Sequence, residues 1–158
     1  MSIEQKVLIV DDYEPNLISL EAVLDDDNWA LIKATSGMQA LKLLLENEVS
    51  LVLLDVQMPE MDGFEVAQMM RKNPRTQTVP IIFLTAISKE DKYIYKGYQA
   101  GAVDYLCKPI NPTILRSKVE FFMKLDMQKK ELEAKLFRAR EHLNAYNDSK
   151  VRIEATTT

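Results

Sequence analysis

Five short apolar runs, separated by segments with helical periodicity, constrain the fold of this chain more than any other feature of its sequence. The runs are KVLIV at 6–10, WALIKA at 29–34, LVLL at 51–54, IIFL at 81–84 and VDYLC at 103–107. Between them, apolar residues recur at helical spacing, as in the series Leu17, Leu20, Val23 and Leu24. Continuous apolar strands that alternate with helices are typical of a parallel sheet covered on both faces. The sequence therefore predicts a doubly wound α/β fold with five strands.

Local signals mark where the helices between these strands should begin and end. A helix is expected after each of the first three strands, the third over 64–70, and a weakly amphipathic helix is expected over 89–99. Asn73-Pro74 should end the third helix, because the residue before proline is disfavoured in the helical region. The last helix should begin at Asn111-Pro112, a capping residue followed by proline at the first helical position.

Polar residues stand at the carboxyl ends of four of the expected strands. They are Asp11-Asp12, Asp55, Thr85 and Lys108-Pro109. Each has an ordinary explanation on its own, such as a helix cap, a strand residue or a solvated charge. In a doubly wound sheet, however, ligands bind outside the carboxyl ends of the strands, and a carboxylate beside a buried strand needs partners. Together these residues predict a functional site at that edge.

The composition limits the classes of function. With 158 residues, 47% hydrophobic and 28% charged, the chain can bury one full core and carry a small extra element. A formal net charge of -4 gives no basic surface for nucleic acid, so direct nucleic-acid binding is not expected. The single cysteine cannot form an internal disulfide, and neither a signal peptide nor a membrane span is evident. A cytoplasmic protein without membrane contact is expected.

The residues from about Gln5 to Phe122 resemble the phosphoacceptor receiver domain of bacterial two-component response regulators. The resemblance rests, in the family's order and spacing, on Asp11-Asp12, Asp55 within DVQMPEMDG, Thr85-Ala86, Tyr105 and Lys108-Pro109. It implies a flavodoxin-like sheet with strand order 2-1-3-4-5. It also implies phosphorelay signalling, in which Asp55 accepts a phosphoryl group from a histidine kinase or a phosphotransfer protein.

The chemistry of phosphoryl transfer agrees with these residue types. A carboxylate such as Asp55 is a competent nucleophile for phosphoryl groups. Transfer brings a multiply charged group against an acidic cluster, so a divalent cation is needed, and hard oxygen ligands suit Mg²⁺ or Mn²⁺. By resemblance, Asp12, Asp55 and the backbone carbonyl of Gln57 are direct metal ligands. Asp11 would act mainly through a metal-bound water and through its charge.

The resemblance also assigns roles on the other side of the site. Lys108 supplies a cation for the phosphoryl oxygens, and Thr85 supplies a hydroxyl donor. The peptide bond between Lys108 and Pro109 is expected to be cis. Thr85 and Tyr105 are expected to move on phosphorylation and to switch a surface formed by the fourth helix, the fifth strand and the fifth helix. Gln57 and Ile87 would flank the phosphoryl group and influence its lifetime.

A receiver domain over residues 1–122 leaves a helical extension over 123–158. Apolar residues continue into it at alternating three- and four-residue steps, with Lys118 and Lys129 filling two gaps: Leu115, Phe122, Leu125, Leu132, Leu136, Ala139, Leu143 and Tyr146. This heptad pattern favours a parallel coiled-coil homodimer. The alternative is one amphipathic helix folded back on its own domain. The extension is expected to be either a linker to an absent output domain or the output itself.

Several smaller features have ordinary interpretations. Cys107 is expected to be a small core residue. His142 could be the phosphohistidine of a kinase helix, but REHLNAY lacks the acidic residue that usually follows such a histidine. A position on a solvated helix face is therefore expected. The acidic run 25–27 is interpreted as a turn at a helix end, since it lacks calcium-loop spacing. The methionines Met58, Met61, Met69 and Met70 are interpreted as loop and core packing.

Two other functions compete with a phosphorylated receiver that is not itself a multiple-turnover enzyme. A phosphatase with a strand-end aspartyl nucleophile typically carries a second Asp two residues later, where this chain has Gln57. A phosphorylation-independent scaffold or dimerisation module on the same fold usually has a damaged acidic site, and here the acidic residues are all present. The receiver hypothesis therefore ranks first.

Overall fold

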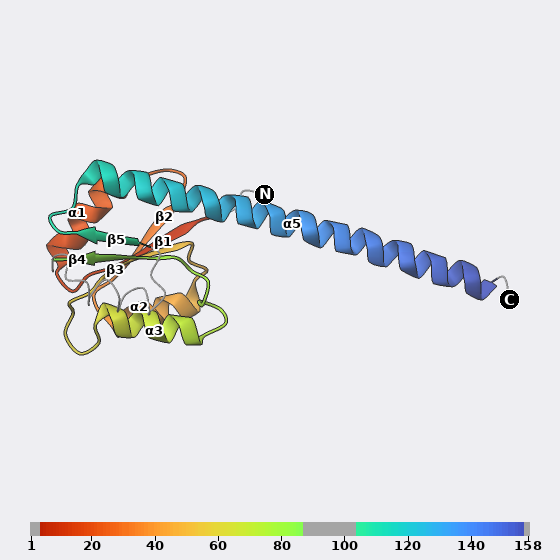
Figure 1. Cartoon of the computed structure of the whole chain (residues 1–158), viewed down its shortest axis with the longest axis horizontal. Helices are drawn as coiled ribbons and strands as arrows, with labels where there is room; N and C mark the ends of the chain where they lie inside the picture. Colours follow the sequence, from red (N-terminus) through yellow and green to blue (C-terminus); the bar gives the residue numbers. More distant parts are fainter. Residues whose placement is uncertain (1–3, 87–103, 157–158) are drawn as a thin grey trace. The chain divides into compact units, whose positions relative to one another are not determined.

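The computed structural model describes residues 4–86 and 104–156 and contains the expected alternation of strands and helices (Figure 1). Its elements are β1 (Lys6–Val10), α1 (Glu14–Leu24), β2 (Ala30–Ala34), α2 (Gly37–Glu46), β3 (Leu51–Asp55), α3 (Gly63–Lys72), β4 (Ile81–Thr85), β5 (Asp104–Cys107) and α5 (Pro112–Thr156). The strands agree with the sequence prediction to within one residue at each end. The helix expected over 89–99 lies outside the described residues.

All five strands are parallel and follow the order β2-β1-β3-β4-β5, which confirms the flavodoxin-like topology. Order and direction place the carboxyl ends of β1, β3, β4 and β5 at one edge of the sheet. The strand order reverses between β1 and β3, because β2 is added on one side of β1 and β3, β4 and β5 on the other. Such folds bind ligands at this point. The polar strand ends predicted from the sequence therefore meet at the ligand edge.

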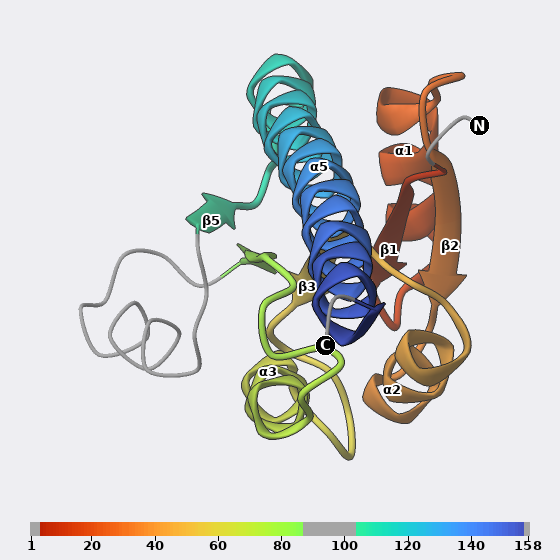
Figure 2. The ribbon, with the colours of Figure 1, turned by 90° about the vertical axis from the view of Figure 1, so that its right-hand side faces the viewer.

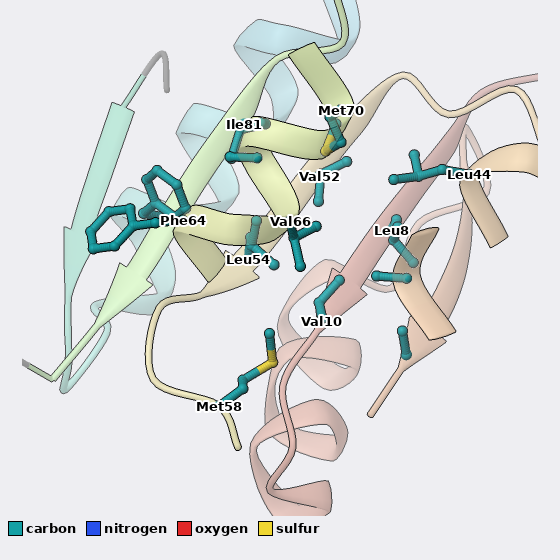
Figure 3. Close-up of a cluster of buried hydrophobic side chains, with 14 of the residues drawn as sticks. Leu8, Val10, Leu44, Val52, Leu54, Met58, Phe64, Val66, Met70 and Ile81 are labelled. Carbon is teal, nitrogen blue, oxygen red and sulfur yellow. The ribbon is translucent and has the colours of Figure 1, made fainter. Parts of the chain in front are cut away.

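Helices cover both faces of the sheet, and each face has its own hydrophobic core. One core lies under α2 and α3 and includes Leu8, Leu44, Val52, Phe64 and Met70, all buried (Figure 3). On the opposite face, α1 and the first turns of α5 cover the sheet (Figure 2). The central strands β3 and β4 are buried along their whole length, as continuous apolar runs require.

The first turns of α5 are fixed to the rest of the domain by capping and by side-chain contacts. The side chain of Asn111 accepts hydrogen bonds from the backbone N–H groups of Thr113 and Ile114, at 2.9 and 3.1 Å. This confirms the predicted cap. Leu115, Val119 and Met123 follow at helical spacing and are buried against β1, β3 and α1.

Arg116 connects α5 to the end of α1. Its Nη1 donates to the backbone carbonyls of Val23 at 3.0 Å and Asp25 at 3.2 Å. Its Nη2 forms an ion pair with Asp26, and its guanidinium lies 5.7 Å from the centre of the Trp29 ring. These carbonyls lie at the helix C-terminus, where the backbone lacks partners of its own and favours a cation. The acidic run 25–27 is thus the helix-end turn predicted from the sequence.

The chain divides into two units, Met1–Met123 and Lys124–Thr158. The second unit is helical from Lys124 to Thr156. Its apolar side chains are largely exposed: Leu125, Leu132, Leu136, Phe137, Leu143, Tyr146, Val151 and Ile153. A shallow apolar groove on this helix is lined by Leu125, Lys129, Leu132 and Leu136, among others.

The structure corrects three expectations from the sequence. The heptad seam does not begin at Leu115, because Leu115 is buried in the first unit's core and Lys118 pairs with Asp104. Cys107 is exposed, because it is the last residue of the edge strand β5. Met69 is also exposed on α3, whereas Met58 and Met70 are buried and Met61 packs against the core, as expected.

Within the described residues, none of the helices combines the length and the hydropathy needed to cross a lipid bilayer.

Candidate functional site

Three carboxylates gather at the carboxyl edge of the sheet. Asp11 directly follows β1, Asp12 follows it in the chain, and Asp55 is the last residue of β3. One carboxylate oxygen from each lies within 4.8 Å of the other two. Asp11 and Asp55 are buried, with 1% and 5% of their surface exposed, whereas Asp12 is exposed. The cluster thus combines two shielded carboxylates with one that faces solvent.

Lys108 places a cation between the two buried carboxylates. Its Nζ lies 3.2 Å from Oδ2 of Asp11 and 3.3 Å from Oδ1 of Asp55. The backbone N–H of Lys108 donates to the carbonyl of Thr85 at 2.7 Å, which fixes the residue where β5 ends. The peptide bond between Lys108 and Pro109 is cis.

Asp11 is held by two further donors, both of which sequence reasoning missed. The backbone N–H of Tyr13 donates to Oδ1 at 2.9 Å, and the side-chain amide of Asn16 donates to Oδ2 at 3.1 Å. Asn16 lies in the first turn of α1, five residues after Asp11. An amide side chain four residues after the acidic pair was the signal that the sequence offered.

The surroundings of Asp55 change its protonation. Burial is the largest influence and, together with the charge of Asp11, raises the pKa of Asp55 to about 6 despite the opposing effect of Lys108. Burial by itself would lower the pKa of Lys108, but Asp55 and Asp11 outweigh it and raise that pKa above its ordinary value. At neutral pH the ionised carboxylate of Asp55 therefore lies beside a protonated Lys108.

The loop after β3 returns the chain beneath Asp55. The backbone N–H of Val56 donates to the carbonyl of Leu84, and the N–H of Gly63 donates to the carbonyl of Val56, at 3.1 and 2.9 Å. Glu60 has a positive φ of 68°, which this tight return requires. Asp62 then caps α3 by accepting from the N–H of Glu65 at 2.9 Å. Gln57 lies on this loop, with its side chain exposed.

Thr85 and Tyr105 complete the set of residues predicted from the sequence. Thr85 ends β4 and is 7% exposed. Tyr105 is half-buried on β5, and the centre of its ring lies 5.4 Å from the ring centre of Phe83. The ring centre of Phe83 in turn lies 5.0 Å from that of Phe64. Tyr105 therefore packs onto the core under α3 rather than standing alone on an edge strand. Ile87 lies outside the described residues.

The donor set fits a hard divalent cation. Three carboxylates converge, two of them buried and one exposed. Oxygen-only ligands of this kind are typical of Mg²⁺, which keeps several waters of its own. Within the part of the chain that the structure describes, this is the single group of His, Cys, Asp or Glu side chains with metal-binding geometry.

Comparison with known proteins agrees with this geometry. Residues 7–120 match the family described as "Response regulator receiver domain". The chain belongs to this family. Receiver domains take part in phosphorelay signalling and are phosphorylated by histidine kinases or phosphotransfer proteins. They generally bind Mg²⁺ at an acidic pocket, which corresponds here to the cluster of Asp11, Asp12 and Asp55.

Curated relatives share the receiver but are much longer proteins. The "Probable cyclic di-GMP phosphodiesterase" of Vibrio cholerae is 41% identical over 114 residues, which are 72% of this chain and 25% of the relative. "Response regulator PleD" of Caulobacter vibrioides is 36% identical over the same shares. "Transcriptional regulatory protein SrrA" of Staphylococcus aureus is 37% identical over 72% of this chain and 46% of its own length. This receiver thus spans between a quarter and a half of these relatives.

Solved receiver structures superpose on the same part of the chain. A putative response regulator from Chloroflexus aurantiacus is 34% identical, with a TM-score of 0.71 over 77% of this chain and 99% of its own. The chemotaxis protein CheY4 of Vibrio cholerae is 29% identical, with a TM-score of 0.70 over 76% and 99%. The shared part corresponds to the receiver and leaves most of the extension unmatched.

Proposed function

We propose that this receiver accepts a phosphoryl group on Asp55 in a Mg²⁺-dependent reaction and passes the change to its C-terminal helix. The observation that carries the proposal is the position of Asp55. Its Oδ1 lies 3.3 Å from the Lys108 ammonium, and its carboxylate belongs to a cluster with Asp11 and Asp12. A nucleophile, a cation and a set of metal ligands are thus adjacent at the ligand edge of the sheet.

In the proposed reaction, a carboxylate oxygen of Asp55 attacks the phosphorus of a phosphohistidine. The new P–O bond forms as the P–N bond breaks, and the imidazole of the donor keeps the electron pair. The attacking carboxylate must be ionised, so a pKa of about 6 leaves Asp55 competent at neutral pH. Burial removes water that would otherwise solvate the carboxylate and compete with the donor.

The acidic cluster needs a counter-charge before it can accept a phosphoryl group. A bound Mg²⁺ would neutralise the developing charge on the phosphoryl oxygens. Asp12, Asp55 and the backbone carbonyl of Gln57 would hold it directly, with Asp11 acting through a water. The exposure of Asp12 supports this arrangement, because it leaves a route by which a hydrated ion enters.

Lys108 and Thr85 would stabilise the transferred group. Lys108 already bridges the two buried carboxylates, so its ammonium can turn to a phosphoryl oxygen over a short path. Thr85 ends the neighbouring strand and would donate its hydroxyl. Movement of Thr85 toward the phosphoryl group, followed by Tyr105, would then bias the surface around β5 and α5. The packing of Tyr105 against Phe83 gives that movement a path into the core.

The helical extension would respond to phosphorylation of the receiver by pairing with the same helix of a second copy of the chain. Its exposed leucines and the apolar groove lined by Leu125, Leu132 and Leu136 support a homodimer through this helix. The heptad pattern of the extension supports a parallel coiled coil, with Lys129 weakening one layer of the seam. We therefore assign the receiver to residues 1–122 and association to the helix that follows, with Met123 still buried in the receiver core.

Phosphorylation is tested by incubating the chain with Mg²⁺ and acetyl phosphate and measuring the intact mass. The proposal predicts a single added phosphoryl group. It should not form when EDTA is present, and it should be absent in Asp55→Asn. Glu65→Gln is a matched control, because Glu65 is an exposed carboxylate on α3 beside the same loop. Full labelling of Asp55→Asn would refute the assignment.

Dimerisation is tested separately by light scattering of the chain with and without acetyl phosphate. The proposal predicts a dimeric mass that the double variant Leu132→Lys/Leu136→Lys reduces to a monomer. Arg138→Glu provides a control on the same helix outside the proposed seam. A monomeric mass of the unaltered chain under both conditions would remove the dimer from the account.

A further inference from the structure

Asn16 contacts the acidic cluster but has no part in the transfer described above. It lies in the first turn of α1 and is half-buried. Its backbone N–H donates to the carbonyl of Tyr13 at 3.0 Å, which fixes the residue at the start of the helix. Its side-chain amide turns back from the helix and donates to Oδ2 of Asp11 at 3.1 Å.

Asp11 is the most fully engaged carboxylate of the cluster. Its Oδ1 accepts from the Tyr13 N–H at 2.9 Å, and its Oδ2 accepts from both Asn16 and Lys108, at 3.1 and 3.2 Å. A carboxylate offers about four acceptor positions, so roughly one is left for a water. Donors on both oxygens also fix the plane of the carboxylate, which is 1% exposed.

The two donors to Oδ2 have different roles in the proposed reaction. Lys108 also contacts Asp55, and in the proposed reaction its ammonium turns to the phosphoryl group. Asp11 would then lose one of its two donors at Oδ2 at the moment when a bound cation most needs a fixed ligand shell. The amide of Asn16 comes from the first turn of α1, where the backbone N–H of the same residue is held by the carbonyl of Tyr13. No hydrogen bond between this amide and Asp55 is found in the described residues, so the amide can stay in place.

We propose that Asn16 is a positioning residue for the acidic cluster: its amide holds Oδ2 of Asp11 and so raises the affinity of the site for Mg²⁺. This inference rests on the proposed function, since it assumes that the cluster binds the cation. The physical reason is preorganisation. Outer-shell partners that orient the groups around a metal ion tune its affinity, and their loss typically weakens binding by about 10-fold or more.

The test is the dissociation constant for Mg²⁺, measured by NMR titration of the unphosphorylated protein. Asn16→Leu has nearly the same shape but no amide, and it should raise the dissociation constant about 10-fold. Asn16→Gln keeps the amide on a longer side chain and should restore part of the affinity. Ser19→Ala is the matched control, because Ser19 lies on the same helix and contacts the carbonyl of Pro15, away from the cluster.

A second readout separates positioning from folding. The rate of phosphorylation by acetyl phosphate should fall in Asn16→Leu at low Mg²⁺ and return close to the unaltered rate at saturating Mg²⁺. A merely structural role would lower the rate at every Mg²⁺ concentration. If Asn16→Leu does not fold, Asn16→Gln and Asn16→Ser are titrated in the same way and decide the question. Both retain a polar donor, on a longer side chain in Gln and a shorter one in Ser. Their Mg²⁺ affinities should rank with that reach.

The outcomes distinguish this inference from the proposed function. If the unaltered chain binds Mg²⁺ and is phosphorylated while Asn16→Leu has the same dissociation constant, Asn16 is not a positioning residue and the proposed function stands. An equal loss of affinity in Ser19→Ala would likewise overturn the assignment to Asn16. If the unaltered chain does not bind Mg²⁺ at all, both proposals fail.

Discussion

Gly63 lies directly against the backbone carbonyl of Asp55: a Cβ atom at position 63 would be 2.3 Å from that oxygen and 3.0 Å from the Cα of Val56. Both neighbouring atoms belong to the backbone and cannot rotate away. The first residue of α3 therefore has to be glycine for the helix to begin beneath the proposed acceptor. The glycine of the DVQMPEMDG motif thus has a steric explanation that does not depend on the chemistry of the site.

The first prediction follows from this contact. Gly63→Ala should lower the free energy of unfolding by about 2 to 4 kcal/mol, because the backbone at the end of β3 or the start of α3 must shift. It should also slow phosphorylation, since Asp55 would move. Chemical denaturation measures the first effect. Gln68→Ala, an exposed position on the same helix, should change stability by less than about 0.5 kcal/mol. Equal stability of Gly63→Ala and the unaltered chain would contradict the close contact.

The second prediction concerns pH and the metal-free protein. Asp55 has a folded-state pKa of about 6, raised from 3.8, so the folded state binds more protons than the unfolded state between these values. Stability should therefore be highest below about pH 4 as far as this group is concerned, and should fall as the pH rises to about 6. At pH 7 the loss amounts to at most about 3 kcal/mol.

Asp55→Asn removes this titrating group, so it should stabilise the metal-free protein at pH 7 and have little effect near pH 4. Thermal unfolding in EDTA at a series of pH values measures the difference. A variant that is equally destabilised across the range would show that the burial of Asp55 carries no such penalty.

The third prediction concerns metal binding. Mg²⁺ at about 100 times its dissociation constant should add about 2.7 kcal/mol to the free energy of unfolding, because the ion binds only the folded cluster. Asp12→Asn should lose most of this gain, whereas Glu21→Gln, a carboxylate paired with Lys33 on the surface, should keep it. Thermal unfolding with and without EDTA gives the shift. The same gain in both variants would place the ion elsewhere.

The fourth prediction concerns the attachment of α5 to α1. Arg116→Ala removes donors to the carbonyls of Val23 and Asp25 and the contact with Trp29, and should cost about 1 to 3 kcal/mol. Arg116→Lys should recover only part of this, because a lysine cannot reach two carbonyls and an aromatic face at once. Denaturation of these variants is compared with Arg138→Ala, an exposed position in the extension. A neutral Arg116→Ala would show that burial of Leu115 and Val119 suffices.

The fold was predictable because the central strands β1, β3 and β4 contain uninterrupted apolar runs and polar residues follow these runs, and both signals are local. The start of the heptad seam was not, because periods of 3.5 and 3.6 residues coincide over short stretches. Leu115 fits both, and only the structure shows that the domain buries it with Val119 and Met123. Cys107 was misplaced because a strand's apolar composition does not reveal that its last residue lies on the sheet edge.

The candidate site was predictable in its carboxylates and its lysine, which stand directly at strand ends. Asn16 was not found, because its contact with Asp11 depends on how α1 begins after the acidic pair, which is a matter of backbone direction rather than of residue type. The same holds for Tyr13, which contributes through its backbone N–H.

The most direct test of the account is to locate the phosphoryl group. After phosphorylation with acetyl phosphate and Mg²⁺, borohydride reduction converts an aspartyl phosphate to homoserine, which peptide mass spectrometry assigns to a residue. We predict homoserine at position 55 alone, dependent on Mg²⁺ and strongly reduced in Lys108→Ala. Homoserine at position 11 or 12, or at none, would contradict the assignment of Asp55 as the acceptor.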